Sequence, residues 1–134
     1  MTAYGYYGTV LVVDLSKGTF EHRSIPEEDL AKFLGGRGLG IKMLWDILPG
    51  PGIDPLSGDN PLIFTTGPLS CFPVPNASLC SIVTKSPHTR PANSPYQHAS
   101  TITYSNMGGF FGPEIRFAGY EGVIIKGRSS TPVY

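Results

Sequence analysis

The sequence predicts an α+β fold that is rich in β-structure, with sheets of mixed or antiparallel strands and two helices near the N-terminus. Short runs of apolar and β-branched residues alternate with turn residues along most of the chain. Helical spacing of apolar residues is concentrated between positions 24 and 48. Glycine and proline supply 17 and 13 of the 134 residues and lie between apolar runs, which is typical of an ordered chain rich in turns. The length corresponds to one domain, residues 1–134.

Composition narrows the classes of function. Ten basic and ten acidic residues give no net charge, which argues against a nucleic-acid-binding module because such modules carry a basic excess. Two cysteines are too few for a disulfide scaffold and fit a reducing cytoplasm. The N-terminus lacks the features of a secretory signal, and the longest apolar runs are far shorter than a membrane span. We therefore expect a cytoplasmic protein that binds neither nucleic acid nor membrane.

The first two strands are expected to form a hairpin. Residues 9–15 (TVLVVDL) and 19–23 (TFEHR) have strand character, and residues 16–18 (SKG) between them supply a short turn. The glycine of this turn suits a positive φ angle.

Two helices should follow the hairpin. Ser24 and Glu27 have the spacing of a capping box, and Pro26 suits the first turn of a helix because its missing N–H costs nothing there. Apolar residues then recur on one helical face, at Leu30, Phe33 and Leu34. The pair Gly35-Gly36 is expected to end this helix, and a second helix is expected over residues 38–48, before the PGPG sequence at 49–52.

The remainder of the chain is expected to be mainly strand and loop. A long polar loop is expected at residues 88–105, a length that suggests a functional excursion or an interface, and one or two helical turns at 113–118. The expected strands are residues 62–66 (LIFTT), 79–85 (LCSIVTK), 121–126 (EGVIIK) and the start of another at 132–134.

Most local candidates for chemistry have a simpler structural explanation. The glycine-rich residues 35–40 follow a predicted helix, whereas dinucleotide and Walker motifs follow a strand, so a helix–helix corner is favoured over a nucleotide site. The set Cys71, Cys80, His88 and His98 matches no zinc or iron–sulfur spacing. No nucleophile motif or convincing pair of carboxylates is present.

Residues 105–112 (SNMGGFFG) are the most informative local stretch. Paired glycines let a backbone approach a ligand closely, and the amide of Asn106 offers both an acceptor and a donor. A tight turn between core elements explains the same residues equally well. Both interpretations stay open from this stretch alone.

Many short motifs, taken in order, resemble the N-terminal domain of the aldehyde:ferredoxin oxidoreductase family, and they extend over nearly the whole chain. They are residues 8–16 (GTVLVVDLS), 33–40 (FLGGRGLG), 54–56 (DPL), 59–60 (DN), 66–69 (TGPL), 84–87 (TKSP), 108–114 (GGFFGPE), 117–120 (FAGY) and 126–127 (KG).

The resemblance implies an oxidoreductase of anaerobic archaea and bacteria that oxidises aldehydes to carboxylates. Two electrons would pass through a 4Fe-4S iron–sulfur cluster to ferredoxin. Tungsten, or molybdenum in its place, would be held by the dithiolenes of two pterin (molybdopterin-type) cofactors. The domain that this chain resembles would form the base under that cofactor, built of β-sheets in two similar halves. The cluster cysteines and the substrate pocket are implied to lie in other domains, so no catalytic residue is expected here and the fragment alone is not expected to be active.

The resemblance also implies which residues bind the cofactor. The family's contacts to the pterin phosphates and their bridging Mg²⁺ fall on Asn106 and on the backbone near Gly108. An amide oxygen suits a hard cation, and glycine lets the main chain approach a phosphate. The implied partners are ferredoxin and the remaining domains of the parent enzyme, and a homodimer is left open.

Several departures from the family pattern keep alternatives open. Leu79 stands where a basic contact to the phosphates is usual, so that contact is lost or replaced by Arg90 or another group. The segment 88–105 is longer than its usual equivalent. The family domain extends beyond position 134, so this domain is expected to be incomplete, as a piece of a longer polypeptide or as a split chain completed by a partner. The alternatives are a scaffold of the same fold that has lost the cofactor, for which an exposed apolar edge at Val133-Tyr134 would argue, and part of an aryl-CoA reductase.

Overall fold

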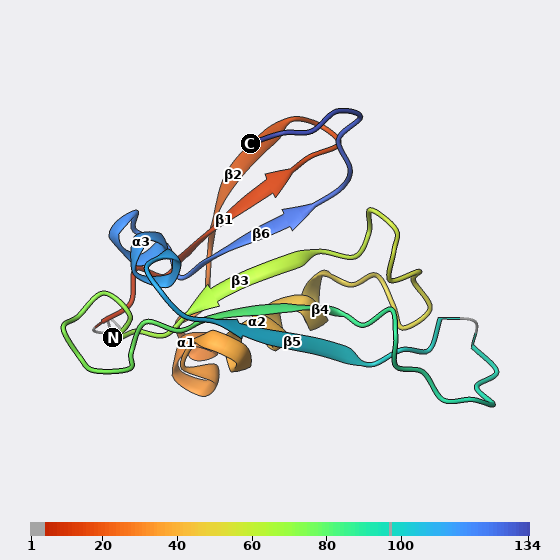
Figure 1. Cartoon of the computed structure of the whole chain (residues 1–134), viewed down its shortest axis with the longest axis horizontal. Coiled ribbons are helices and arrows are strands. Elements are labelled where there is room, and N and C mark those ends of the chain that lie inside the picture. Colours follow the sequence, from red (N-terminus) through yellow and green to blue (C-terminus); the bar gives the residue numbers. More distant parts are fainter. Residues whose placement is uncertain (1–4, 97) are drawn as a thin grey trace.

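The expected α+β fold is confirmed by a computed structural model, which describes residues 5–96 and 98–134. Six strands form one mixed sheet in the order β2-β1-β6-β3-β4-β5, and three helices are present in the described part of the chain (Figure 1). The elements are β1 (Thr9–Asp14), β2 (Thr19–Ser24), α1 (Glu27–Phe33), α2 (Gly36–Ile47), β3 (Leu62–Thr66), β4 (Cys80–Lys85), β5 (Ile102–Met107), α3 (Phe111–Phe117) and β6 (Gly122–Lys126).

The sheet consists of a hairpin and a meander that are joined by the last strand. β1 and β2 form the expected antiparallel hairpin, and β3, β4 and β5 are antiparallel to one another. β6 lies between the two units, parallel to β1 and antiparallel to β3. Ile124 of β6 pairs with Val12 on one side and with Ile63 on the other, so one residue joins both units of the sheet.

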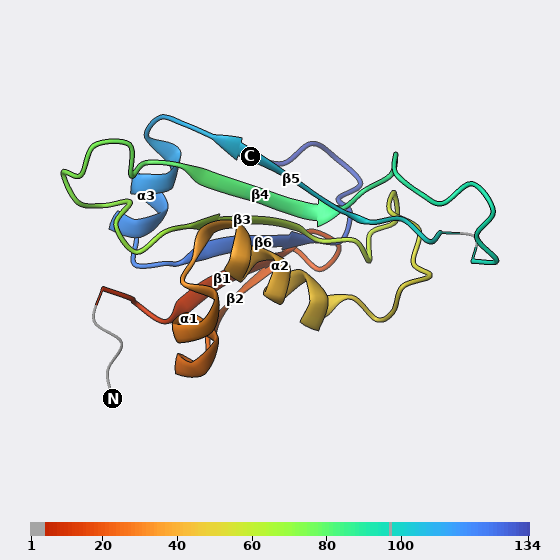
Figure 2. The same ribbon diagram turned by 90° about the horizontal axis from the view of Figure 1, so that it is seen from below.

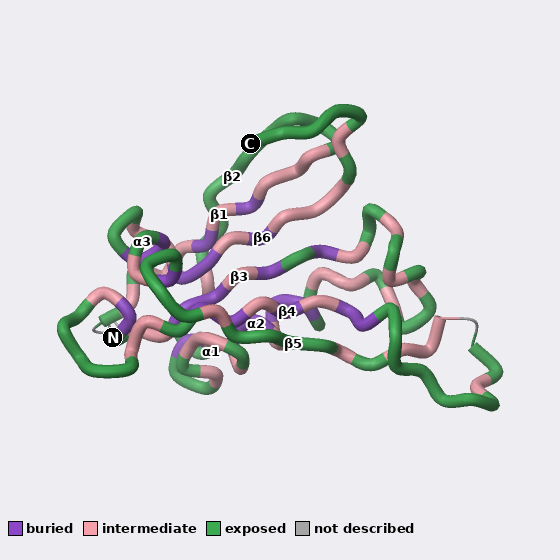
Figure 3. The backbone as a smooth tube through the Cα atoms, viewed as in Figure 1, coloured by how far each residue is buried: buried purple, intermediate pink, exposed green. Residues whose placement is uncertain are grey.

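The main core lies between one face of the sheet and the helices α1 and α2, which lie together on that side (Figure 2). Alternate strand residues point to this face because side chains in a strand point to opposite faces in turn. Buried segments lie along the four middle strands, whereas β2 is exposed throughout (Figure 3). The buried apolar side chains of this core are Val10, Val12, Leu30, Leu39, Met43, Leu44, Ile63, Val83 and Ile124.

Helix α2 packs closely on β3 and β4. A Cβ atom at Gly40 would lie 2.8 Å from Cγ2 of Val83 and 3.0 Å from Oγ1 of Thr65, so a glycine is needed at this contact. The Thr65 hydroxyl also donates a hydrogen bond of 2.7 Å to the carbonyl oxygen of Gly36. These contacts hold the first turn of α2 above the middle of the sheet.

The other face of the sheet has a partial cover. Phe111 of α3 packs edge-on against Phe64, at a ring-centroid distance of 5.6 Å. Phe64 lies between Ile63 and Thr65, which both face α2, so α3 covers the opposite face. Other strand residues on that face are only half-buried, namely Leu11, Val13, Val123 and Ile125.

A buried ion pair anchors α3 to β6 and to the N-terminal segment. Arg116 donates from Nη1 to Oε2 of Glu121 and from Nη2 to the carbonyl oxygen of Gly5, both at 2.5 Å. Oε1 of Glu121 accepts hydrogen bonds from the backbone N–H groups of Tyr7 and Gly8. Both charged side chains are almost completely buried, at 2% and 0% exposure. A polar network thus holds α3 in place.

The predicted capping box at Ser24 and Glu27 is wrong. Ser24 is the last residue of β2, where it pairs with Thr9, so its side chain does not cap the helix. The N-cap of α1 is Pro26, and no side chain donates or accepts a capping hydrogen bond there. As expected, α1 ends directly before the Gly35-Gly36 pair, with Phe33 as its last residue and Leu34 as its C-cap. Leu34 adopts a left-handed φ of 61°. The second helix begins at Gly36, two residues earlier than expected.

Two other expectations about the chain are corrected. Residues 102–107 form β5 instead of belonging to loops, and six residues of this strand pair with residues 80–85 of β4. β5 is an edge strand with mostly exposed side chains, so it lacks the apolar alternation that marks a strand in sequence. Residues 132–134 do not form the start of a strand, and Val133 and Tyr134 are exposed.

Candidate functional site

A pocket of about 440 Å³ lies at the N-terminal end of α2, where the α1–α2 corner meets the ends of β3, β4 and β5. Its residues come from four separate segments of the chain. They are Leu34, Gly35, Gly36, Gly67, Pro68, Leu69, Ser70, Ala77, Leu79, Ser81 and Asn106. The pocket contains one of the two binding residues that the resemblance implied.

The glycine corner forms one wall of this pocket. A Cβ atom at Gly35 would lie 2.7 Å from the carbonyl oxygen of Thr66, and φ is +139° at Gly35 and +51° at Gly36. Only glycine satisfies both the space and the backbone angle at Gly35. The N-terminus of α2 has no side-chain cap, so backbone N–H groups of its first turn are left to bind water or a ligand. The corner favoured by the sequence is therefore present, and it borders the pocket.

Asn106 lines the same pocket from β5. It lies on β5 directly across from Ser81 of β4, and Oγ of Ser81 donates a hydrogen bond of 3.0 Å to Oδ1 of Asn106. Ser81 is buried and Asn106 is exposed, so a fixed hydroxyl orients an accessible amide. Oδ1 retains a second lone pair, and the NH₂ group retains two donors.

Gly108 follows β5 and does not line the pocket. It is exposed, and no atom lies within 4 Å of the position that its Cβ would occupy. Its backbone is thus open to a large ligand that extends beyond the pocket. The structure brings Asn106 into the pocket and places Gly108 two residues further along the chain.

The lining of the pocket carries no ionisable side chain among the described residues. Leu79 lies in it with half of its surface exposed. Arg90, which the sequence offered as a substitute for the basic contact, lines a separate pocket with Asp54 and His98. That second pocket lies in the loops beyond the other end of β4, so Arg90 is not a neighbour of Asn106.

Sequence reasoning missed one basic residue at the edge of the pocket. Arg37, in the first turn of α2, places Cζ 4.5 Å from the centroid of the Tyr104 ring. Tyr104 lies on β5, two residues before Asn106 and therefore on the same face. The available signal was the position of an arginine among the four glycines of residues 35–40. Its pairing with Tyr104 depends on the tertiary fold.

The two cysteines and two histidines noted in the sequence do not form a metal site. Cys71 and Cys80 are both free thiols, and the described residues contain no group of three or more His, Cys, Asp or Glu side chains arranged to bind a metal. Burial raises the pKa of the Cys80 thiol, which keeps it protonated at neutral pH. Cys80 acts as a small core residue.

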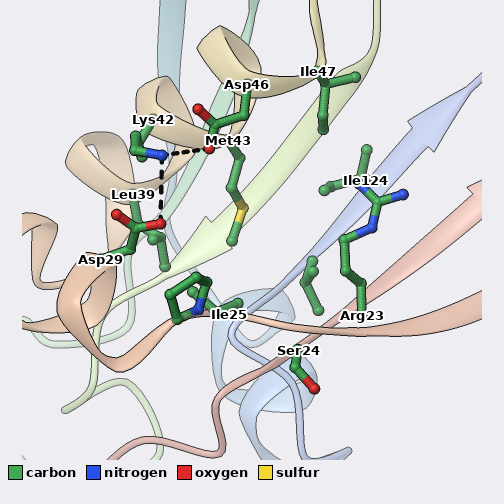
Figure 4. Close-up of a pocket in the computed structure, with 12 residues that line it drawn as sticks. Arg23, Ser24, Ile25, Asp29, Leu39, Lys42, Met43, Asp46, Ile47 and Ile124 are labelled. Atoms are coloured by element: carbon green, nitrogen blue, oxygen red, sulfur yellow. Dashed lines mark hydrogen bonds and ion pairs between the residues drawn. The ribbon is translucent and has the colours of Figure 1, made fainter.

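A smaller pocket of about 120 Å³ opens between the hairpin and the helices (Figure 4). Apolar side chains such as Ile25, Met43 and Ile124 form its walls. At its rim Lys42 of α2 forms an ion pair with Asp29, which joins α1 to α2, and a second one with Asp46 within α2. The ion pairs satisfy these charges, so we interpret this pocket as an opening in the core.

In the parts of the chain that the structure describes, no helix is both long and apolar enough to cross a membrane.

Comparison with known families shows to which family the chain belongs. Residues 10–134 match the family model described as "Aldehyde ferredoxin oxidoreductase, N-terminal domain". The chain belongs to the aldehyde ferredoxin oxidoreductase family. The resemblance that the ordered motifs indicated is confirmed.

Curated relatives within this family are considerably longer than the chain. It is 40% identical over 131 residues to the tungsten-containing aldehyde ferredoxin oxidoreductase of Pyrococcus horikoshii, covering 98% of this chain and 20% of the relative. It is 37% identical over 133 residues to the WOR-like subunit of an aliphatic sulfonate oxidoreductase of Pyrococcus furiosus, covering 98% of this chain and 19% of the relative. The chain thus spans about a fifth of the length of the aldehyde ferredoxin oxidoreductase relatives.

A solved structure supports the same fold. The chain resembles the active-site complex BamBC of benzoyl coenzyme A reductase, which was solved in complex with 1,5-dienoyl-CoA. The TM-score is 0.85 at 37% identity, over 98% of this chain and 18% of that one. The aldehyde ferredoxin oxidoreductase family fold is therefore shared with a reductase of an aromatic acyl-CoA.

Proposed function

We propose that this chain is the tungstopterin-binding part of a larger oxidoreductase that oxidises aldehydes to carboxylates and reduces ferredoxin. The observation that carries the proposal is the pocket at the N-terminus of α2, which contains Asn106 in a family whose curated relatives are tungsten enzymes. Four of these relatives, at 39–40% identity, bear the name aldehyde ferredoxin oxidoreductase. The proposal includes the partners that the resemblance implied: the remaining domains of the parent enzyme, ferredoxin and a second copy of the protein in a homodimer.

The residues of the pocket fit a pterin cofactor that carries phosphate. The glycine corner at residues 35–36 permits close approach by the main chain, and an uncapped helix N-terminus attracts anions. Apolar side chains such as Leu34, Leu69 and Leu79 suit the flat ring of a pterin. The amide of Asn106 can bind a phosphate oxygen through NH₂ or a Mg²⁺ ion through Oδ1.

In this proposal the residues of the chain bind and orient the cofactor. Ser81 holds the Asn106 amide in one orientation, and the backbone near Gly108 offers further contacts. The cofactor, when bound, would supply the two-electron redox chemistry, and a 4Fe-4S cluster in other domains would carry the electrons. Apolar walls would exclude water from the pterin side of the site.

A second candidate is a reductase of aromatic acyl-CoA substrates. The structural likeness to the benzoyl coenzyme A reductase complex favours it, at an identity close to that of the aldehyde enzymes. Both candidates use this domain to hold a cofactor, so they differ in substrate and in the direction of electron flow. Assays of the intact protein with aldehydes and with aromatic acyl-CoA thioesters would separate them.

Replacement of Asn106 tests the cofactor role. We expect Asn106→Ala, in the intact protein purified without oxygen, to lower both the tungsten and the pterin content at least several-fold, because the pocket loses its oriented amide. Metal would be measured by mass spectrometry and pterin by fluorescence of its oxidised form. Asn93→Ala is the matched control, since Asn93 lies in the loop beyond the far end of β4 and should leave both contents unchanged.

The same measurements define what would contradict the proposal. Normal tungsten and pterin contents in a folded Asn106→Ala variant would show that Asn106 does not bind the cofactor. A folded wild-type protein without metal and without pterin would instead favour a scaffold that has lost its cofactor. Molybdenum in place of tungsten would keep the pterin role and correct the metal.

A further inference from the structure

The pocket at the N-terminus of α2 poses a problem of charge. The proposed ligand carries phosphate groups, but no described residue that lines the pocket is ionisable. The positive end of the α2 dipole compensates only part of a phosphate charge, because its effective charge is about half a unit. A cationic side chain at the edge of the pocket would complete the site.

Arg37 is placed to supply that charge. It directly follows Gly36, which lines the pocket, and a Cβ atom at Gly36 would lie 3.6 Å from Oγ of Ser81. Ser81 in turn is hydrogen-bonded to Asn106. The first turn of α2 and the Asn106 amide therefore meet at one point, with Arg37 beside it.

Tyr104 holds the Arg37 side chain in this region. The guanidinium carbon lies 4.5 Å from the centroid of the Tyr104 ring, within the range of a cation–π contact. Tyr104 and Asn106 are neighbours on the same face of β5, which is the face that α2 covers. In the described part of the chain Arg37 forms no ion pair, so its charge is not already neutralised by a carboxylate.

A stacked guanidinium suits a phosphate ligand. Stacking occupies the face of the planar group and leaves the N–H groups at its edge, which match two phosphate oxygens. The contact with Tyr104 also limits the rotamers of a long side chain, so less conformational entropy is lost on binding.

We propose that Arg37, held against the ring of Tyr104, binds a phosphate group of the cofactor beside Asn106 and supplies the positive charge that the pocket lining lacks. This inference rests on the proposed function, because it assigns one further residue to the same site. It identifies Arg37 as a binding residue and Tyr104 as a positioning residue.

Substitutions in the intact protein test the assignment. Arg37→Gln should speed the loss of pterin during dialysis against 0.5 M NaCl by about tenfold, the effect expected for a hydrogen bond to a charged group. Tyr104→Ala should cause a smaller increase in the same rate, whereas Tyr104→Phe should leave it unchanged because the ring remains. Arg23→Gln is the control for the loss of an arginine, since Arg23 lies on β2 and pairs with Glu21.

A rescue variant distinguishes charge from structural damage. Leu79 lines the pocket, so Arg37→Gln combined with Leu79→Arg should restore pterin retention by placing a guanidinium in the pocket lining. The wild type should also lose pterin faster at higher salt, and this dependence should be weaker in Arg37→Gln because fewer charges are screened. Thermal unfolding of each variant would confirm that it is folded.

The outcomes separate this inference from the proposed function. If Asn106→Ala lowers pterin content and folded Arg37→Gln retains pterin as the wild type does, the role of Arg37 is overturned and the pocket stands. If neither substitution changes pterin content, the pocket itself is overturned as the cofactor site. A loss in Arg37→Gln that Leu79→Arg restores supports the assignment of Arg37.

Discussion

The two faces of the sheet use alternate residues of the same strands but are buried to very different extents. On the face covered by α1 and α2, Val12 and Ile124 are no more than 2% exposed. Their immediate neighbours Val13 and Ile125 point to the other face and are only half-buried. Burial of apolar area is the main favourable contribution to folding, so most of the stability should come from the face that α1 and α2 cover.

The means of attachment also differ between the faces. α2 is held by apolar contacts and by the close approach of Gly40 to Val83. α3, on the second face, exposes Phe117 and is anchored by the buried ion pair of Arg116 with Glu121. A helix held by a buried ion pair needs both charged side chains, because a buried charge without its partner destabilises the fold. The comparison teaches that the less covered face relies on a polar anchor.

Breaking the ion pair should have the largest effect. Arg116→Met leaves the buried carboxylate of Glu121 without its cation, so we expect the free energy of unfolding to fall by about 4 kcal/mol. Urea denaturation followed by circular dichroism would measure it. Lys32→Met is the matched control: Lys32 pairs with Glu28 on an exposed helix surface, and its loss should cost less than about 0.5 kcal/mol. Equal effects of the two substitutions would refute the anchoring role.

Two adjacent isoleucines give the cleanest comparison of the faces. Ile124→Ala empties a fully buried position under α2 and should cost roughly 3 kcal/mol, from lost burial and the resulting cavity. Ile125→Ala removes the same atoms from the half-buried face and should cost about 1 kcal/mol. The same denaturation experiment measures both variants. A larger cost for Ile125→Ala would reverse the assignment of the two faces.

The smallest expected effect is a difference in the alkylation rates of the two cysteines, because α3 shields Cys80 from solvent. Cys80 is fully buried next to Gly112 of α3, and burial raises the pKa of its thiol, so little reactive thiolate forms. Cys71 is half-buried in a loop. Iodoacetamide at neutral pH should modify Cys71 at least about tenfold faster than Cys80 in the folded protein, and both at similar rates in urea. Peptide mass spectrometry would follow each site, and rapid folded-state labelling of Cys80 would contradict the proposed cover.

The sequence allowed prediction of those elements whose residues are buried. Residues 9–14, 62–66 and 122–126 are apolar strands bounded by turn residues, so local pattern and tertiary position agree. β5 escaped prediction because its mostly exposed residues have no apolar pattern and no short turn joins it to β4, so only its ladder with β4 identifies it. The other edge strand, β2, is also exposed but was expected because a short turn joins it to β1. The start of α1 was misplaced because a polar residue in a strand can mimic the spacing of a cap.

Prediction of the candidate site was limited for a related reason. Asn106 was expected from the family resemblance, and the structure brings it into a pocket. Its contact with Ser81 and the stacking of Arg37 on Tyr104 depend on the register between β4 and β5 and on the position of α2. Neither the register nor this position is encoded in a short stretch of residues, so these partners required the folded structure.

The central place of β6 also has a consequence for the order in which a ribosome produces the protein. β1 and β2 can pair as soon as they emerge, and so can β3, β4 and β5, because each set is contiguous in the sheet. The two sets have no shared strand until residues 122–126 are synthesised. Until then a nascent chain would present unpaired edges on β1 and β3, a state in which premature release or stalled translation favours aggregation.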